Sequence, residues 1–303
     1  MILSKPNHIK IYGHRGARGD LPENTIESFK YLFENNINAY ETDILISKDL
    51  VPIITHDFKL DPDFTRDSSG DWISEDDIKI FDLTYEELSR FDISSINKKT
   101  KYGRRFASQK GLIDQKIPKL SELLELTSQS NSDELVINLE IKSTPIEDNL
   151  TPPPDVMVKL ITDVVSKSKL KDKIIYSSFD WRVLREIKNL DPKISRAYLT
   201  SEQKGKVYDK SPWMDFMPLY DSDSRELPRL IKTLGGEAWH PRHKDISRDI
   251  VKISHAEGLP VNVWTVNEEY DMMRMIDYGV DGIMTDYPLR LKELCERKNI
   301  KWF

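Results

Sequence analysis

The sequence has one cysteine, no long apolar run and no excess of basic residues, and each absence narrows what the chain can be. Because Cys295 is the single cysteine, the chain cannot form an internal disulfide. No apolar run approaches the roughly 20 residues of a membrane-spanning helix. The start of the chain lacks an apolar segment of signal-peptide length. A formal net charge of −6 argues against nucleic acid as the main ligand, since nucleic-acid binding needs a basic face.

We therefore expect a soluble protein without stable membrane insertion. A cytoplasmic location is the simplest reading, and a periplasmic or secreted one applies if a signal peptide has been removed. The chain has 303 residues, of which 38% are hydrophobic, enough for a sizeable core in one large domain or two modest ones. The sequence leaves the oligomeric state open.

Strand-like apolar runs alternate with segments of helical spacing along most of the chain. The predicted strands are Ile9–Gly13, Ala39–Ile46, Glu134–Ile141, Lys173–Ser177, Ile194–Leu199, Glu237–His240, Val261–Val266 and Gly282–Thr285. The predicted helices of this alternation are Asn24–Phe33, Leu120–Leu126, Asp155–Ser166, Trp181–Leu190, Arg225–Leu234, Ile246–Glu257, Glu268–Ile276 and Pro288–Glu296. Eight such units predict an α/β fold, a (β/α)8 TIM barrel. A doubly wound sheet is the alternative fold, and Trp213–Met217 could be a ninth strand.

Residues 58–118 interrupt this rhythm. The segment is rich in Asp, Ser, Lys and aromatic residues and contains one short helical pattern, Tyr85–Arg90. Its aromatic content favours a folded flap. We therefore expect a single barrel domain over residues 1–303 with a small insertion at about 58–118, after the second strand.

Acidic and basic residues occur at the ends of the predicted strands. Glu41 and Asp43 share one face of a strand because alternate residues point the same way, and the same holds for Glu140 and Lys142. In a TIM barrel the carboxyl ends of the strands line the active site. Three carboxylates converging there need a cation, and an all-oxygen set favours Mg²⁺ or Ca²⁺.

The remaining charges suit a phosphodiester. Arg15 and Lys142 together with one divalent ion would balance three carboxylates and one phosphodiester. His14 and His56 could act as general acid and base, since imidazole titrates near neutral pH. Structural readings stay open: Glu41 and Asp43 could form ion pairs with Lys142 and Arg15 without a metal, and a strand-end histidine can be purely structural.

The sequence predicts the roles of several other residues less definitely. Asn24 is expected to be the N-cap of the first helix. His240 and His243 could reach the pocket, and Trp264 is either a core residue or a pocket wall. Cys295 is read as inert.

The ordered set of motifs resembles the glycerophosphodiester phosphodiesterase family. The motifs are Gly13-His14-Arg15-Gly16, Pro22-Glu23-Asn24-Thr25, Glu41-Thr42-Asp43, His56-Asp57, Glu140-Ile141-Lys142, Trp264-Thr265-Val266-Asn267 and Gly282-Ile283-Met284-Thr285-Asp286. The resemblance implies a TIM barrel with a small inserted domain, and metal-dependent hydrolysis of deacylated phospholipids to sn-glycerol 3-phosphate and an alcohol. It also implies attack by the neighbouring glycerol hydroxyl, through a cyclic phosphate that water opens.

Carried over by position, the resemblance assigns roles to individual residues. His14 and His56 are the acid–base pair, assisted by Arg15. The ligands of one divalent ion, Mg²⁺ or Ca²⁺, are Glu41, Asp43 and Glu140. Arg15 and Lys142 contact the phosphate, and Trp264 packs on the glycerol of the small-molecule substrate.

The segment after His56-Asp57 departs from the commonest form of the family. Phe58–Asp67 stands where many relatives carry Arg-Thr-Thr and a glycine, so the released alcohol stays open among choline, ethanolamine, glycerol and inositol. Two further functions are alternatives. One is a lysophospholipase D that acts on single-chain lipids, and the other is a barrel that binds phosphodiesters without turning them over.

Overall fold

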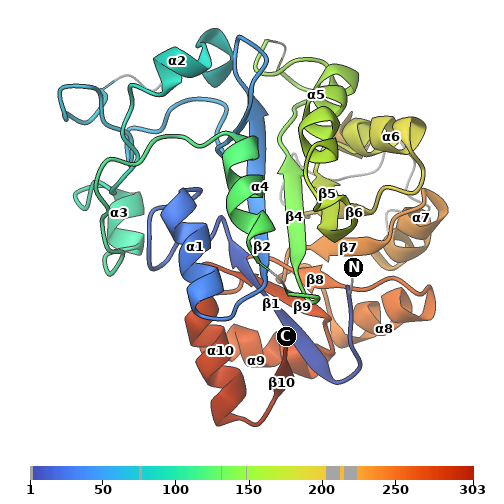
Figure 1. Ribbon diagram of the computed structural model, residues 1–303. Helices are drawn as coiled ribbons and strands as arrows, with labels where there is room; N and C mark the ends of the chain where they lie inside the picture. The colour runs from blue at the N-terminus through green and yellow to red at the C-terminus, as the bar shows by residue number, and fades with distance from the viewer. Residues whose placement is uncertain (1–2, 75–76, 131, 148, 203–211, 215–223) are drawn as a thin grey trace.

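A computed structural model describes residues 3–74, 77–130, 132–147, 149–202, 212–214 and 224–303. Parallel strands form a central ring, and helices cover its outer face (Figure 1). In the described part of the chain the strands of this ring are β1 (His8–His14), β2 (Ala39–Ile46), β4 (Val136–Ile141), β5 (Ile174–Ser178), β6 (Arg196–Thr200), β7 (Ala238–Pro241), β8 (Asn262–Val263) and β9 (Gly282–Thr285).

Strand order and register close this sheet into a barrel. The order is β7-β6-β5-β4-β2-β1-β9-β8, with every neighbouring pair parallel. Parallel bridges between Trp239 and Val261 and between Arg242 and Trp264 join the two ends of this order. The predicted (β/α)8 barrel is therefore confirmed and the doubly wound alternative is wrong, because a doubly wound sheet has two open edges.

The eight predicted strands agree with the structure to within about two residues at most ends, and β8 is the exception at two residues long. For the suggested ninth strand, Trp213 and Met214 lie in a short 3-10 helix, and residues 215–217 fall outside the described ranges. Two strands off the ring were not predicted as strands. The short β3 (Pro52–Ile54) pairs antiparallel with β2, and β10 (Lys301–Trp302) pairs with β1.

The helices of the ring pack apolar stripes against the strands, in the way their helical spacing predicts. They are α1 (Ile26–Glu34), α4 (Leu120–Ser128), α5 (Pro154–Ser166), α6 (Trp181–Leu190), α7 (Leu227–Thr233), α8 (Arg248–Ala256), α9 (Glu269–Tyr278) and α10 (Pro288–Arg297). α9 ends at Gly279, whose φ of 83° is the left-handed conformation common at helix ends. The expected N-cap of α1 was wrong. Thr25, not Asn24, accepts the hydrogen bond from the Ser28 amide.

The segment between β3 and α4 lies at the end of the barrel toward which β2 points (Figure 1). It contains α2 (Tyr85–Leu88) and α3 (Lys101–Arg105). Its apolar residues, among them Leu60, Ile80 and Leu88, share one buried cluster with Leu45 of β2 and Ile53 of β3. Because this cluster includes Leu45 of the barrel strand β2, we propose that residues 58–118 are an insertion within a single barrel domain.

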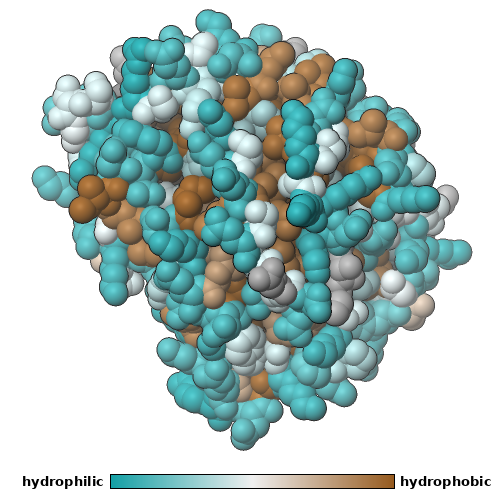
Figure 2. Space-filling model, in the orientation of Figure 1, coloured by the Kyte–Doolittle hydropathy of each residue, from teal (hydrophilic) through white to brown (hydrophobic). Residues whose placement is uncertain are grey.

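The surface is mainly hydrophilic on the face seen in Figure 2, where apolar groups form small separate patches. Large apolar side chains with high exposure include Ile113 at 89% and Tyr270 at 78%. Among the described residues, no helix combines the length and the hydropathy needed to cross a membrane.

Candidate active site

The loop after β1 has an unusual backbone. Arg15 has a φ of 53° and Asn24 one of 55°, both in the left-handed region that non-glycine residues seldom adopt. The Arg15 amide donates to the backbone and side-chain oxygens of Glu41 at 3.0 and 3.1 Å. Asn24 donates from Nδ2 to Asp43 Oδ2 at 3.2 Å. Strained backbone of this kind costs about 1–3 kcal/mol per residue and clusters at functional sites.

Gly16 makes the same loop possible. Its φ is 82°, and a Cβ at this position would lie 2.4 Å from Ser28 Oγ, which the Ala17 amide uses as an acceptor. The loop therefore packs directly on the first turn of α1, and this contact fixes the position of the neighbouring Arg15.

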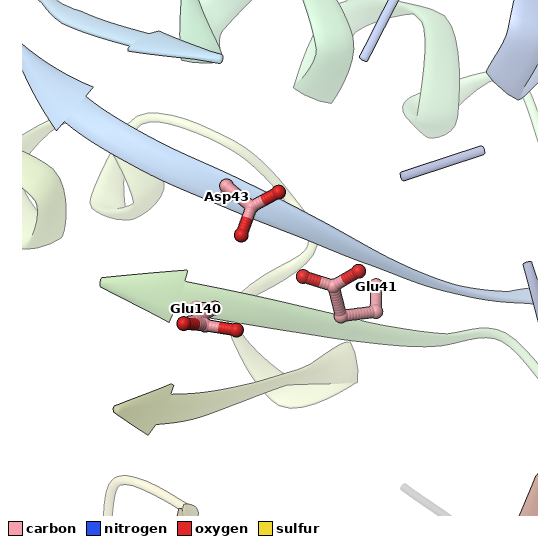
Figure 3. Close-up of side chains that lie close together, drawn as sticks. All are labelled: Glu41, Asp43 and Glu140. Atoms are coloured by element: carbon pink, nitrogen blue, oxygen red, sulfur yellow. The ribbon is translucent and has the colours of Figure 1, made fainter. Parts of the chain in front are cut away.

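Three carboxylates meet where the middle of β2 runs beside the carboxyl end of β4. The register pairs Asp43 with Glu140, and Glu41 precedes Asp43 by two residues on the same face. Figure 3 shows the three carboxylates gathered between the two strands. One oxygen from each lies within 4.8 Å of the others, and all three residues are at most 8% exposed.

This set suits a hard divalent cation. Oxygens bound to one Mg²⁺ or Ca²⁺ lie about 2.0–2.6 Å from it, which allows separations of up to about 5 Å between them. Glu41 Oε1 and Asp43 Oδ1 are buried without a hydrogen-bond partner. Burial and then the charges of Asp43 and Glu140 raise the pKa of Glu41 well above its usual value, and burial also raises the pKa of Glu140. A cation would supply the missing partner.

Ion pairs alone do not account for all three carboxylates. Arg15 Nε lies 3.2 Å from Asp43 Oδ2, and Lys142 Nζ lies 2.8 Å from Glu140 Oε1 and 3.8 Å from Asp43 Oδ1. Burial would raise the pKa of Asp43, but Arg15 and nearby cations lower it. The only ion-pair contact recorded for Glu41 in the described chain is with His14 Nε2, at 3.7 Å. The hypothesis that these carboxylates form ion pairs without a metal therefore fits Asp43 and Glu140 better than Glu41.

His14 stands at the end of β1 with its ring held by a carboxylate. Its Nδ1 lies 2.7 Å from Asp286 Oδ1, a residue that directly follows β9. This contact leaves Nε2 on the side of Glu41. Burial and the neighbouring Arg18 lower the pKa of His14 to about 4, so the imidazole is neutral near pH 7. A neutral imidazole with a fixed Nδ1 partner can accept a proton at Nε2.

Asp286 connects two parts of the site. Arg18 donates to both oxygens of Asp286, at 2.7 Å from Nε and 3.0 Å from Nη2, and Asn267 Nδ2 donates at 2.6 Å. Burial would raise the pKa of Asp286, but Arg18 and His14 hold it well below the usual value. The carboxylate is therefore ionised while it holds His14.

His56 has the same kind of support. Its Nδ1 lies 2.7 Å from Asp57 Oδ1, and 28% of its side chain is exposed. Burial, followed by the charges of Arg15 and Lys142, lowers the pKa of His56 well below 6.5. Each of the two candidate histidines therefore has its Nδ1 atom against a carboxylate and its ring near the carboxylate cluster.

Trp264 lies just after β8 and is partly buried. Its indole Nε1 donates to the His240 carbonyl at 2.9 Å, and its ring meets Phe179 edge-on at 5.3 Å. Lys142 Nζ lies 6.0 Å from the centre of the Phe179 ring. Trp264 therefore belongs to the same end of the barrel as Lys142.

His240, His243 and Cys295 are buried. His240 is fully buried and accepts from Asn262 Nδ2 at 3.0 Å. His243 Nδ1 lies 3.1 Å from the Trp264 carbonyl, so neither histidine is placed among the carboxylates by a recorded contact. Cys295 is buried on α10, and burial raises the pKa of its thiol to about 11, which agrees with an inert thiol.

Sequence reasoning gave no role to three residues that hold the candidate site together. They are Arg18, Glu23 and Asp286. Glu23 accepts from Arg15 Nη1 at 2.8 Å. The sequence did contain a signal for Asp286. Asp286 directly follows the predicted strand Gly282–Thr285, and His14 directly follows the predicted strand Ile9–Gly13, so both were expected at the same end of the barrel. In a closed barrel the first and last strands are neighbours.

Comparison with known proteins identifies relatives over the whole barrel. The model of the glycerophosphoryl diester phosphodiesterase family matches residues 14–290. A glycerophosphodiester phosphodiesterase of Bacillus altitudinis is 29% identical over 289 residues, covering 95% of this chain and 98% of the relative.

Two solved structures extend this result. A Silicibacter pomeroyi DSS-3 protein, provisionally named a glycerophosphoryl diester phosphodiesterase, superimposes with a TM-score of 0.89 and 33% identity. The match covers 99% of this chain and 98% of that one. An Oleispira antarctica phosphodiesterase solved with its product sn-glycerol-3-phosphate has a TM-score of 0.70 and 23% identity, over 95% and 96% of the two chains. At that identity the second match bears on the fold alone.

Proposed function

This chain belongs to the glycerophosphoryl diester phosphodiesterase family and is a phosphodiester hydrolase, and on that premise we propose the reaction and the roles of its residues. The proposed reaction is hydrolysis of a glycerophosphodiester to sn-glycerol 3-phosphate and an alcohol. The observation that carries it is the meeting of three buried carboxylates, two carboxylate-supported histidines and two cations at one end of the barrel.

We assign the carboxylates of Glu41, Asp43 and Glu140 to one divalent ion, Mg²⁺ or Ca²⁺. When bound, this ion would neutralise part of the carboxylate charge and polarise a phosphodiester oxygen. Glu41 Oε1 and Asp43 Oδ1, which have no hydrogen-bond partner, support the assignment.

The phosphate contacts are assigned to Arg15 and Lys142. Both cations already lie against Asp43, and the planar guanidinium of Arg15 can hold two phosphate oxygens at once. Trp264 would pack on the glycerol, beside Lys142 and Phe179.

His14 and His56 are assigned as the acid–base pair. One imidazole, in its neutral form, takes the proton of the attacking hydroxyl. The other, in its protonated imidazolium form, gives a proton to the oxygen of the departing alcohol, so that the P–O bond breaks without an unprotonated alkoxide. Their Nδ1 contacts with Asp286 and Asp57 support this role, because each leaves Nε2 available.

The test follows sn-glycerol 3-phosphate released from glycerophosphocholine. Four samples are compared: the wild type with Mg²⁺ or Ca²⁺, the wild type with EDTA, His14→Ala with metal, and His8→Ala with metal as the matched histidine control. We expect activity only in the first and last samples. Full activity of His14→Ala would contradict the acid–base assignment, and activity in EDTA after exhaustive dialysis would contradict the metal assignment.

A second substrate distinguishes the lysophospholipase D alternative. Lysophosphatidylcholine is assayed in the same four samples. Turnover of this lipid with none of glycerophosphocholine would show that the proposed substrate is wrong. The residue assignments would then be tested with the same variants on the lipid.

A further inference from the structure

The segment 58–118 supplies one side chain to the network that holds Arg15. The Tyr102 hydroxyl, at the start of α3, donates to Glu23 Oε2. The other oxygen of Glu23 accepts from Arg15 Nη1 at 2.8 Å, while Arg15 Nε faces Asp43 at 3.2 Å. The guanidinium is therefore fixed between two carboxylates, and one of these is oriented by Tyr102.

A second cation, Arg18, lies close to Glu23. Arg18 Nη1 lies 3.6 Å from the same Oε2 that Tyr102 contacts. Burial would raise the pKa of Glu23, but Arg15, Arg18 and the Tyr102 hydroxyl together lower it to about 2, so it is ionised. Without the hydroxyl, Arg18 is the cation that contacts Oε2 in the described part of the chain, and rotation of the carboxylate toward Arg18 would weaken its hold on Arg15.

The ring of Tyr102 is held independently of its hydroxyl. It packs on Phe106 at 5.0 Å and on Phe64 at 5.6 Å. The same stretch is anchored to the β1–α1 loop by Gln109, whose Nε2 donates to the Arg18 carbonyl at 2.7 Å. Tyr102→Phe should therefore remove the hydroxyl and leave this packing in place.

We propose that Tyr102 is a positioning residue for the phosphate-binding Arg15, acting through Glu23. The segment 58–118 then takes part in binding the phosphate group as well as covering that end of the barrel. This inference rests on the proposed function, because it needs Arg15 to bind the phosphate of the substrate.

The test measures binding and turnover separately. Binding of sn-glycerol 3-phosphate with Ca²⁺ is followed by calorimetry, and glycerophosphocholine hydrolysis gives kcat and KM. The variants are Tyr102→Phe, Glu23→Gln and the double variant. Tyr85→Phe is the matched control, since its hydroxyl contacts the Ile117 carbonyl in the same segment.

We expect Tyr102→Phe to weaken product binding and raise KM by about three- to tenfold, with a smaller effect on kcat. Tyr85→Phe should leave both unchanged. In the Glu23→Gln background the Tyr102→Phe substitution should have little further effect, because the residue through which it acts is already altered.

Wild-type binding and KM in Tyr102→Phe would overturn the inference while leaving the proposed function intact. An equal effect of Tyr102→Phe with and without Glu23→Gln would overturn it too, since a purely structural loss would not depend on Glu23. A wild type that neither binds sn-glycerol 3-phosphate nor hydrolyses glycerophosphocholine would overturn the proposed function, and this inference with it.

Discussion

In the metal-free protein, burial and the charges of Asp43 and Glu140 disfavour the ionised form of Glu41, so we expect Glu41→Gln to stabilise that state. At an effective dielectric constant of about 20, two carboxylates whose oxygens lie within 4.8 Å of each other repel by about 3 kcal/mol or more. A glutamate can escape this cost by binding a proton. The penalty at pH 7 is therefore capped at about 3 kcal/mol, the linkage value for the interval between its ordinary pKa of 4.5 and pH 7.

The substitution keeps the useful contact of the side chain. Glu41 Oε2 accepts from the Arg15 amide, and the carbonyl oxygen of a glutamine can do the same. The new amide group would occupy the position of the unpartnered Oε1 and can donate to a neighbouring carboxylate. We expect a net gain of about 1–3 kcal/mol in the free energy of unfolding in EDTA.

Urea denaturation measures this effect, with and without a saturating divalent ion. Wild-type protein should gain about 2–3 kcal/mol from an ion present at about 100 times its dissociation constant, and Glu41→Gln should gain much less. Glu125→Gln, which changes an exposed carboxylate on α4, is the control and should match wild type in both conditions. Lower stability of Glu41→Gln in EDTA, or equal metal stabilisation of both proteins, would refute the reasoning.

Three further perturbations test other contacts. Asp286→Asn should lower kcat by about 100-fold, because His14 loses the carboxylate that orients its ring; an unchanged kcat in stopped assays would exclude that role. His255 has a raised pKa, since its Nε2 hydrogen-bonds Asp281 at 2.7 Å. Its stabilising contribution, below about 1 kcal/mol at this exposed site, is present below pH 6.5 and lost as pH rises through the folded pKa. The stability difference between wild type and His255→Asn should therefore shrink at high pH, and a difference that grows would contradict this sign. Gly16→Ala should cost more than about 1 kcal/mol in thermal denaturation because of its φ of 82°, and wild-type stability would show that the loop relaxes freely.

The sequence predicted the parts of the site that depend on local periodicity. Alternation along a strand places Glu41 and Asp43 on one face, and the structure agrees. Glu140 lies beside Asp43 because of the register between β2 and β4. The pattern of residues within one strand does not determine that register. The expected closeness of these carboxylates came from the general rule for barrel strand ends.

Contacts between distant segments were beyond sequence reasoning. The Tyr102–Glu23 hydrogen bond joins residues 79 apart, across a segment whose fold could not be read from periodicity. Asn24 illustrates a different limit. Its residue type suits an N-cap, but its left-handed backbone turns the side chain toward Asp43 and leaves capping to Thr25. Helix-start signals of adjacent polar residues cannot be separated without the backbone conformation.

The hydrogen bond between His14 and Asp286 spans 272 residues and crosses the seam between the first and last parallel strands of the barrel. During synthesis, His14 emerges near the beginning of the chain and Asp286 near its end. Until β9 docks beside β1, the Nδ1 atom of His14 lacks its carboxylate partner, and Arg18 lacks the same partner. If His14 and the carboxylates have the roles proposed above, activity requires closure of the ring. A partly folded chain could then hold all three proposed metal ligands and still lack an ordered His14.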